Sequence, residues 1–222
     1  MTENNLDTTK SATATADQLI ALRSVITKFL KDSVGSKILE LETDGQFPRE
    51  IYEQLGDIGA FGCIFSEELG GSNMGFEALA IVSEEIAYAY PPLSACMNLQ
   101  AATVPLTIQN WGTSDQVKEY VPGLIAGKLL GSNAMSEPDG GTDLLGAMRT
   151  VAERVGDHYV INGSKMWITN ANVADLSIVY CKTDPNAGHR GVSAFLIDTD
   201  TPGFEVSRVK CRVLGSLMPT NS

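Results

Sequence analysis

Histidine and cysteine are scarce in this chain of 222 residues, which contains two histidines and four cysteines. The cysteines lie far apart, at Cys63, Cys96, Cys181 and Cys211, and lack the spacing of metal ligands. We therefore expect free, buried thiols rather than disulfides or a zinc site. With only His158 and His189 available, we also expect no histidine-based metal or nucleophile site.

Basic residues are outnumbered, at 16 against 27 acidic ones, and the net charge of −11 opposes binding to nucleic acid. No apolar run of about 18 residues could span a bilayer, and the N-terminus lacks the pattern of a secretion signal. Neither a GxGxxG nor a Walker loop occurs, so a Rossmann or P-loop nucleotide site has no support. These absences predict a cytoplasmic chain without a membrane span.

The first half of the chain has a helical pattern. Residues 1–16 show no apolar periodicity and are predicted to form a flexible tail. Apolar residues then recur every three or four positions, which predicts amphipathic helices from Asp17 to Leu30, from Pro48 to Ile58, from Phe76 to Tyr90, and from Ser114 to Ala126, with an apolar segment between the last two. Asp17 is expected to be the N-cap of the first helix.

After Lys128 the apolar period changes from about 3.6 to 2, which predicts a helical domain at residues 17–130 and a β domain at residues 131–222. The Gly156-Asp157 turn predicts a hairpin between 151–155 and 158–161. Further strands are predicted at 164–169, 176–182, 192–198 and 204–209. The fold class is therefore α+β, an all-α domain followed by an antiparallel β-barrel or sandwich.

Two stretches suit a ligand site. Residues 133–143 read Asn-Ala-Met-Ser-Glu-Pro-Asp-Gly-Gly-Thr-Asp, and residues 167–170 read Trp-Ile-Thr-Asn. Both place hydroxyl side chains beside apolar ones, as a wall facing a flat, polar-edged ligand would. The turn at 138–141 would free backbone N–H groups, including toward an anion. Either stretch alone reads as a surface turn or a hairpin corner.

Together with other landmarks in the same order, these stretches resemble the acyl-CoA dehydrogenase family. The landmarks include Glu67-Glu68-Leu69-Gly70-Gly71, Trp111-Gly112-Thr113, Tyr120-Val121-Pro122, Ser136-Glu137-Pro138, Gly141-Thr142-Asp143, Asn162-Gly163-Ser164-Lys165, Trp167-Ile168-Thr169-Asn170 and Asp200-Thr201-Pro202-Gly203. The resemblance covers the chain from about Asp17 onward. It implies the first two domains of that family, a helical domain and a middle β domain.

The resemblance implies FAD as cofactor and α,β-dehydrogenation of a saturated acyl thioester, with hydride transfer to the flavin. Seven residues match the family's flavin site: Ala134, Met135, Ser136, Thr142, Trp167, Ile168 and Thr169. Ser136, usually threonine in the family, would border the pyrimidine edge of the ring, and Thr142 would lie near the pyrophosphate. Trp167 would lie against the ring, with Thr169 reaching toward N5.

The family's catalytic base is a glutamate of a C-terminal helical domain, and no residue here matches it. Neither Glu137 nor any of Glu67, Glu68, Glu84 and Glu85 falls at its place, so no catalytic residue is assigned. We therefore expect this chain to be the N-terminal part of such an enzyme, with its β domain incomplete and no activity alone. The arginine that reads a distal carboxylate in the glutaryl-CoA branch corresponds to Ser94, which disfavours a dicarboxyl substrate.

The resemblance also implies an acyl-CoA or acyl-carrier-protein thioester as substrate, an electron-transfer flavoprotein as acceptor, and a homo-oligomer when the protein is complete. Two alternatives stay open. The chain could be a non-catalytic module that binds flavin, thioester or a partner subunit. It could instead belong to a branch that uses the same fold for flavin oxygen chemistry, as an oxidase or monooxygenase.

Overall fold

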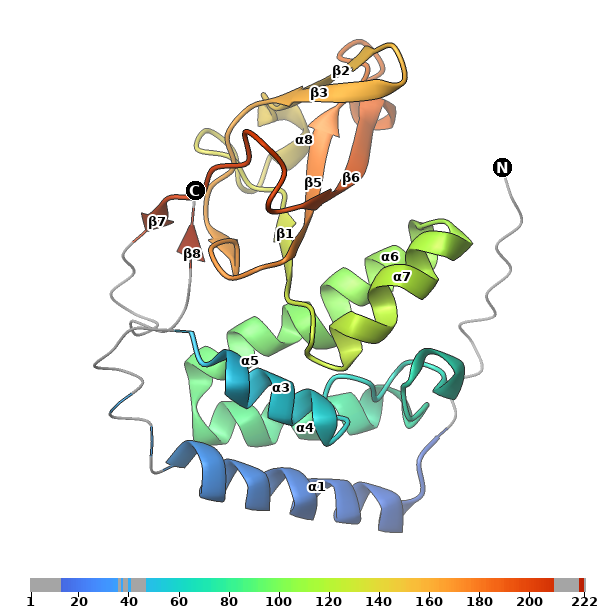
Figure 1. Ribbon diagram of the computed structural model, residues 1–222, viewed down its shortest axis with the longest axis vertical. Coiled ribbons are helices and arrows are strands. Elements are labelled where there is room, and N and C mark those ends of the chain that lie inside the picture. The colour runs from blue at the N-terminus through green and yellow to red at the C-terminus, as the bar shows by residue number, and fades with distance from the viewer. Residues whose placement is uncertain (1–12, 36, 38–39, 41–46, 210–219, 222) are drawn as a thin grey trace. The chain divides into compact units, whose positions relative to one another are not determined.

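The computed structural model describes residues 13–35, 37, 40, 47–209 and 220–221 (Figure 1). The described residues up to Leu130 form one compact unit, and those from Gly131 onward form a second. Helices make up the first unit, and both sheets lie in the second. The α+β class predicted from the sequence is confirmed.

The helical unit follows the predicted apolar pattern closely. Its elements are α1 (Ala16–Leu30), η1 (Lys31–Gly35), α3 (Arg49–Asp57), η2 (Glu67–Leu69), α4 (Gly75–Ala89), α5 (Pro91–Asn98), η3 (Leu99–Thr103), α6 (Val104–Trp111) and α7 (Ser114–Ile125). None of the helices in the described part of the chain is long and apolar enough to cross a membrane.

Asp17 was wrongly predicted as the first N-cap. Thr15 caps α1 instead, because its hydroxyl accepts from the Gln18 N–H while the Gln18 side chain accepts from the Thr15 N–H. This reciprocal capping box satisfies two N–H groups that the first turn of a helix leaves without partners. Helix α1 therefore begins at Ala16, inside the segment predicted as a tail, and Thr113 and Gln116 cap α7 in the same way.

Helix α1 packs against α4, and the two form the base of the helical unit (Figure 1). Ile26 and Leu30 of α1 are buried, as are Val82 and Ile86 of α4. At the edge of this contact the Arg23 guanidinium forms ion pairs with Glu84 and Glu85 of α4. Because ion pairs at such an edge contribute little, burial of the apolar faces supplies most of the free energy of packing between α1 and α4.

The segment from Pro91 to Trp111 is continuous helix with a wider turn in its middle. The π-helical turn η3 separates α5 from α6. Within η3, Gln100 is fully buried, and its amide Nε2 donates to the backbone oxygens of both Leu124 and Leu129. One side chain thus bonds the carbonyl of Leu124, which also accepts from the Gly127 N–H, and the carbonyl of Leu129, which lies beyond the end of α7.

The second unit contains a mixed sheet, not the wholly antiparallel one predicted. Its elements are β1 (Gly131–Ala134), α8 (Leu144–Ala147), β2 (Val151–Val155), β3 (His158–Asn162), β4 (Ile168–Thr169), β5 (Leu176–Lys182), η4 (Gly188–Gly191), β6 (Val192–Asp198), β7 (Arg208–Val209) and β8 (Thr220–Asn221). The main sheet has the order β1-β5-β2-β3, with β6 paired to β5. Strand β1 runs parallel to β5, whereas β2 with β3 and β5 with β6 are antiparallel.

Two of the predicted strands differ from the structure. The predicted hairpin and the strands at 176–182 and 192–198 form as expected, whereas β1 was not predicted. Of the strand predicted at 164–169, only β4 forms, because Trp167 takes a positive φ of 63° that breaks an extended run. Of the strand predicted at 204–209, only β7 forms, and it pairs with β8, which in turn pairs with β4, in a second sheet.

A small apolar core holds the second unit together. Ala134 of β1, Ala152 of β2, Ile168 of β4 and Cys181 of β5 are buried in one cluster, against which Phe195 of β6 packs. The three described cysteines, Cys63, Cys96 and Cys181, are free and buried as predicted. Cys211 lies outside the described residues.

Gly127, which follows α7, should tolerate substitution poorly. Its φ is +69°, and a Cβ there would lie 2.6 Å from the Tyr52 carbonyl oxygen. Gly59 has a comparable φ of +81° but open space around it. Both alanine variants incur the left-handed cost of roughly 1–2 kcal/mol. We expect Gly127→Ala to lose a further ~1–3 kcal/mol through the clash, measured as the free energy of unfolding in urea. Equal losses in the two variants would contradict this account.

Candidate functional site

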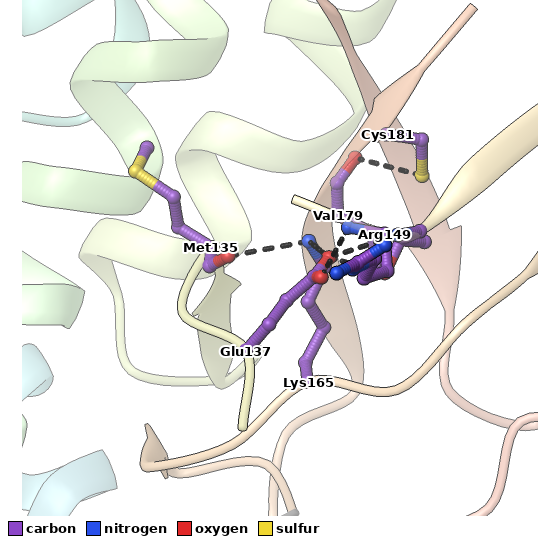
Figure 2. Close-up of polar contacts among 7 residues, drawn as sticks. Met135, Glu137, Arg149, Lys165, Val179 and Cys181 are labelled. Atoms are coloured by element: carbon purple, nitrogen blue, oxygen red, sulfur yellow. Dashed lines mark hydrogen bonds and ion pairs between the residues drawn. The ribbon is translucent and has the colours of Figure 1, made fainter. Parts of the chain in front are cut away.

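The two stretches singled out in the sequence meet at one point. Lys165 Nζ donates to the backbone oxygen of Met135 at 3.2 Å, and the Met166 N–H donates to the backbone oxygen of Ser136 at 2.9 Å. Lys165 Nζ also donates to Glu137 Oε1 at 2.8 Å. Three consecutive residues after β1 therefore each accept a hydrogen bond from Lys165 or Met166, directly before Trp167. Figure 2 shows the Lys165 ammonium between Met135 and Glu137.

The Glu137 carboxylate collects further donors. It accepts from the backbone N–H groups of Arg149 and Thr150 and from the Thr150 hydroxyl, in addition to Lys165. Figure 2 shows Arg149 and Lys165 beside this carboxylate. The side chains of Glu137 and Lys165 are only 3% and 10% exposed. A carboxylate can be buried in this way because four hydrogen bonds and an opposite charge replace its hydration.

These contacts decide the charge state of Glu137. Burial alone would raise the pKa of its carboxyl group. The hydrogen bonds from Lys165, the Thr150 hydroxyl and the two backbone N–H groups outweigh burial and lower the pKa to about 2. Glu137 is therefore ionised at neutral pH. Nearby, burial raises the pKa of the Cys181 thiol to about 11, so that group stays protonated.

The turn after Glu137 is closed by its own backbone. The Glu137 N–H donates to the Gly140 oxygen and the Gly140 N–H donates to the Glu137 oxygen. Asp143 then caps the short helix α8, where its carboxylate accepts from the Gly146 N–H at 3.0 Å. Thr142 lies between these two structures with its side chain exposed. In the part of the chain that the structure describes, no hydrogen bond links Thr142 to the other six predicted site residues.

Trp167 lies at a bend directly before the two-residue strand β4, and a turn begins at Asn170 directly after it. Trp167 has a φ of 63° and Asn170 has a φ of 68°, both in the left-handed region that a bulky residue such as tryptophan rarely enters. The indole is 56% exposed, whereas Ile168 is buried in the core of the second unit. Asn170 Nδ2 donates to the Gly131 oxygen at 3.4 Å, which ties the residue after β4 to β1. The bend at Trp167 therefore presents the indole to solvent while the next residue, Ile168, anchors the chain.

The structure brings six of the seven predicted residues together. Ala134, Met135 and Ser136 lie at the end of β1, next to Trp167, Ile168 and Thr169 around β4. The side chains of Ala134 and Ile168 point into the apolar core, so only their backbones can border a ligand. Met135, Ser136 and Thr169 are half-buried. Thr142 is the exception described above.

The polar groups at this place suit a ligand with hydrogen-bonding edges. Among the described residues, the hydroxyl groups of Ser136, Thr142 and Thr169 have no side-chain hydrogen bond to another residue. The amide oxygens of Asn133 and Asn170 are buried without a donor. A half-exposed indole beside the unengaged hydroxyl groups of Ser136 and Thr169 fits a planar ring with a polar rim, as in a flavin.

Sequence reasoning assigned no role to Glu137, Lys165 or Thr150. Glu137 was considered only as a catalytic base and set aside, and Lys165 was quoted only as part of a landmark. The signal that could have found them is their charge. Glu137 lies inside the first stretch, and Lys165 lies two positions before the second.

Two family models match the chain. The model described as acyl-CoA dehydrogenase, N-terminal domain, matches residues 16–128, and the one described as acyl-CoA dehydrogenase, middle domain, matches residues 132–216. The two matches lie on either side of the division between the helical unit and the β unit.

Curated relatives and solved structures agree with these models. A 2-methylacyl-CoA dehydrogenase, mitochondrial, of Solanum tuberosum is 37% identical over 82% of this chain and 45% of its own length. The structure of a glutaryl-coenzyme A dehydrogenase with glutaryl-CoA has a TM-score of 0.88 and 36% identity, covering 93% of this chain and 53% of that one. A glutaryl-CoA dehydrogenase from Mycobacterium smegmatis in complex with FADH2 has a TM-score of 0.84 and 26% identity, covering 93% and 53%. The chain spans about half the length of the curated relatives it matches.

Glu137 should make the stability of the chain fall in acid. Its folded-state pKa of about 2 lies below the ordinary 4.5, so its contribution is complete above about pH 4.5 and is lost as pH falls from there through about 2. This depression corresponds to roughly 3 kcal/mol. We expect Glu137→Gln to remove this component from the free energy of unfolding, measured in urea across that pH window.

Glu153→Gln is the matched control, because it changes an exposed carboxylate on β2. This variant should keep the acid-dependent loss of the original chain. If Glu137→Gln showed the same acid-dependent loss of stability, the carboxylate of Glu137 would not be the source of that loss.

Proposed function

The chain belongs to the acyl-CoA dehydrogenase family, as its motifs predicted, and from this premise we propose that it forms the flavin-ring side of an FAD-dependent acyl-CoA dehydrogenase. The reaction removes two hydrogens from a saturated acyl thioester and gives the 2-enoyl thioester. FAD supplies the acceptor of the hydride. The observation that carries the proposal is the set of three hydrogen bonds that joins Met135, Ser136 and Glu137 to the residues before Trp167.

Each polar residue at this place has a distinct proposed role. The Ser136 hydroxyl donates to the pyrimidine edge of the ring, and the Trp167 indole covers a face of the ring. Thr169 donates at the hydride-accepting edge, while Thr142, on its exposed turn, binds the pyrophosphate. Support for these roles is that the three hydroxyl groups have no other side-chain partner among the described residues. The unpaired Asn133 and Asn170 oxygens add acceptors behind them.

A proton next to a thioester carbonyl is weakly acidic, so its removal needs a base near the α-carbon. Glu137 is unsuited to that role, because its carboxylate is buried and committed to four hydrogen bonds. Glu84 and Glu85 are paired with Arg23 in the helical unit. We therefore propose that the base comes from the part of the relatives' length that this chain does not cover.

The proposed substrate is an acyl-CoA without a distal carboxylate. Residues 91–111 contain no charged side chain, and Ser94 stands within α5 where a cation would be needed to read a second carboxylate. An electron-transfer flavoprotein is the proposed acceptor, and a homo-oligomer is the proposed assembly. The name of the potato relative places that protein in mitochondria, and a cytoplasmic location for this chain stays a prediction.

Binding of FAD tests the placement of the ring. Removing the indole in Trp167→Ala should weaken binding by roughly 1.5–3 kcal/mol, or about tenfold to a hundredfold. Thr169→Ala removes one hydrogen bond and should cost about 0.5–1.5 kcal/mol. Flavin fluorescence titration measures both constants, and we expect the original chain itself to bind more weakly than nanomolar.

The other tryptophan supplies the control. Trp111 is 86% exposed at the end of α6 in the helical unit, so Trp111→Ala should leave FAD binding unchanged. An effect of Trp111→Ala as large as that of Trp167→Ala would mean that the ring is wrongly placed.

Turnover tests the assignment of the base. When the 222-residue chain loaded with FAD is mixed anaerobically with saturated acyl-CoA thioesters, we expect its flavin absorbance to stay unchanged, because Glu137 cannot take the α-proton. Rapid bleaching by any of the thioesters would show that one of this chain's own residues acts as the base.

A further inference from the structure

We propose that the buried Glu137–Lys165 ion pair is the positioning element of the site, holding the Trp167 indole in its strained bend and so presetting the surface on which the proposed flavin lies. Neither residue touches the ligand in this proposal. Both act through the backbone of their neighbours. The part that concerns FAD rests on the proposed function, whereas the part that concerns Trp167 does not.

Lys165 is hydrogen-bonded to the residues on both sides of Ser136. Its ammonium donates to the Met135 oxygen on one side and to the Glu137 carboxylate on the other. The next residue, Met166, donates its N–H to the Ser136 oxygen between them. The backbone is thus fixed up to Met166, and Trp167 is the first residue beyond the contact.

Trp167 needs such support. Its φ of 63° is a conformation that costs a bulky L residue free energy and persists only where the surroundings over-determine it. After Trp167, the buried Ile168 and the bond from Asn170 to Gly131 hold the chain. Before Trp167, the Lys165 and Met166 contacts hold it. If the first anchor is lost, the bend can relax toward negative φ, and the indole can leave its position.

The energetics favour positioning over stability as the role of this pair. Bringing two ions out of water offsets much of their attraction, and replacing a buried pair by apolar residues of similar volume is often neutral for stability. The turn chemistry of Ser136-Glu137-Pro138 does not itself require a charge. What an apolar pair could not supply is the directional link from Lys165 to two oxygens that flank Ser136.

The first test needs no cofactor. The chain has two tryptophans, so a Trp111→Phe background leaves Trp167 as the only fluorescent indole. In this background, Lys165→Met should increase the fast local motion of Trp167 in time-resolved fluorescence anisotropy. Lys128→Met, which removes a lysine from the exposed ion pair with Asp57, should not. Lys165→Arg, which keeps the charge and several donors, should restore most of the order.

A double variant separates positioning from stability. Glu137→Gln with Lys165→Met leaves no unpaired buried charge, so it should be more stable in urea than either single variant. Its Trp167 should nevertheless stay mobile. A double variant with the Trp167 anisotropy of the parent chain would overturn the proposal.

Should any of these variants fail to fold, Thr150→Val removes only one hydrogen bond from Glu137, and it should raise Trp167 mobility by a smaller amount. An unchanged anisotropy there would overturn the proposal as well.

FAD titration of the same variants completes the test. We expect the affinity of the double variant to fall about tenfold, as for loss of a charged hydrogen bond, with Lys128→Met unchanged. If the parent chain binds no FAD, the proposed function fails while the anisotropy result still decides the positioning role. If the parent binds FAD and the double variant binds it equally well, the positioning proposal fails and the proposed function stands.

Discussion

A carboxylate and an ammonium group removed from water must find all their partners inside the protein, and this constraint shapes the second unit. Glu137 satisfies it by accepting hydrogen bonds from Arg149 and Thr150, directly before β2. Lys165 satisfies it by donating to Met135, directly after β1, as well as to Glu137. Segments far apart in sequence therefore converge on two buried charges. The proposed site lies directly beside this point of convergence.

The parts of the fold that depend on local chemistry could be predicted from the sequence. The hairpin of β2 and β3 follows from a Gly156-Asp157 turn between alternating residues, and α7 follows from a threonine cap and an apolar stripe. Strand β1 could not be predicted, because Gly-Ser-Asn-Ala has little strand propensity and extends only as the parallel partner of β5. Parallel pairing between distant segments leaves no local pattern to read.

The candidate site shows the same division. The residues proposed to face a ligand, such as Ser136 and Trp167, lie in stretches that could be recognised by composition and order. The ion pair proposed to position them could not be recognised, because Glu137 and Lys165 are 28 positions apart and no local pattern links them. The left-handed φ of Trp167 was equally hidden, since it is imposed by contacts and not by the residue. The strand predicted at residues 164–169 was therefore too long, because only the two residues after the bend at Trp167 are extended as β4.

Gln100 in the π-helical turn restricts which side chains can stand at its position. Its amide nitrogen donates to the backbone oxygens of both Leu124 and Leu129, and the Leu124 oxygen also accepts from the Gly127 N–H. Leucine at this place would remove the donor that the two oxygens share, glutamate would set a third acceptor against them, and asparagine has a side chain shorter by one carbon. The backbone of η3 and the backbone at the end of α7 are thus linked and cannot shift independently of each other. A substitution at position 100 therefore removes a direct link between the π-helical turn and the backbone at and beyond the end of α7.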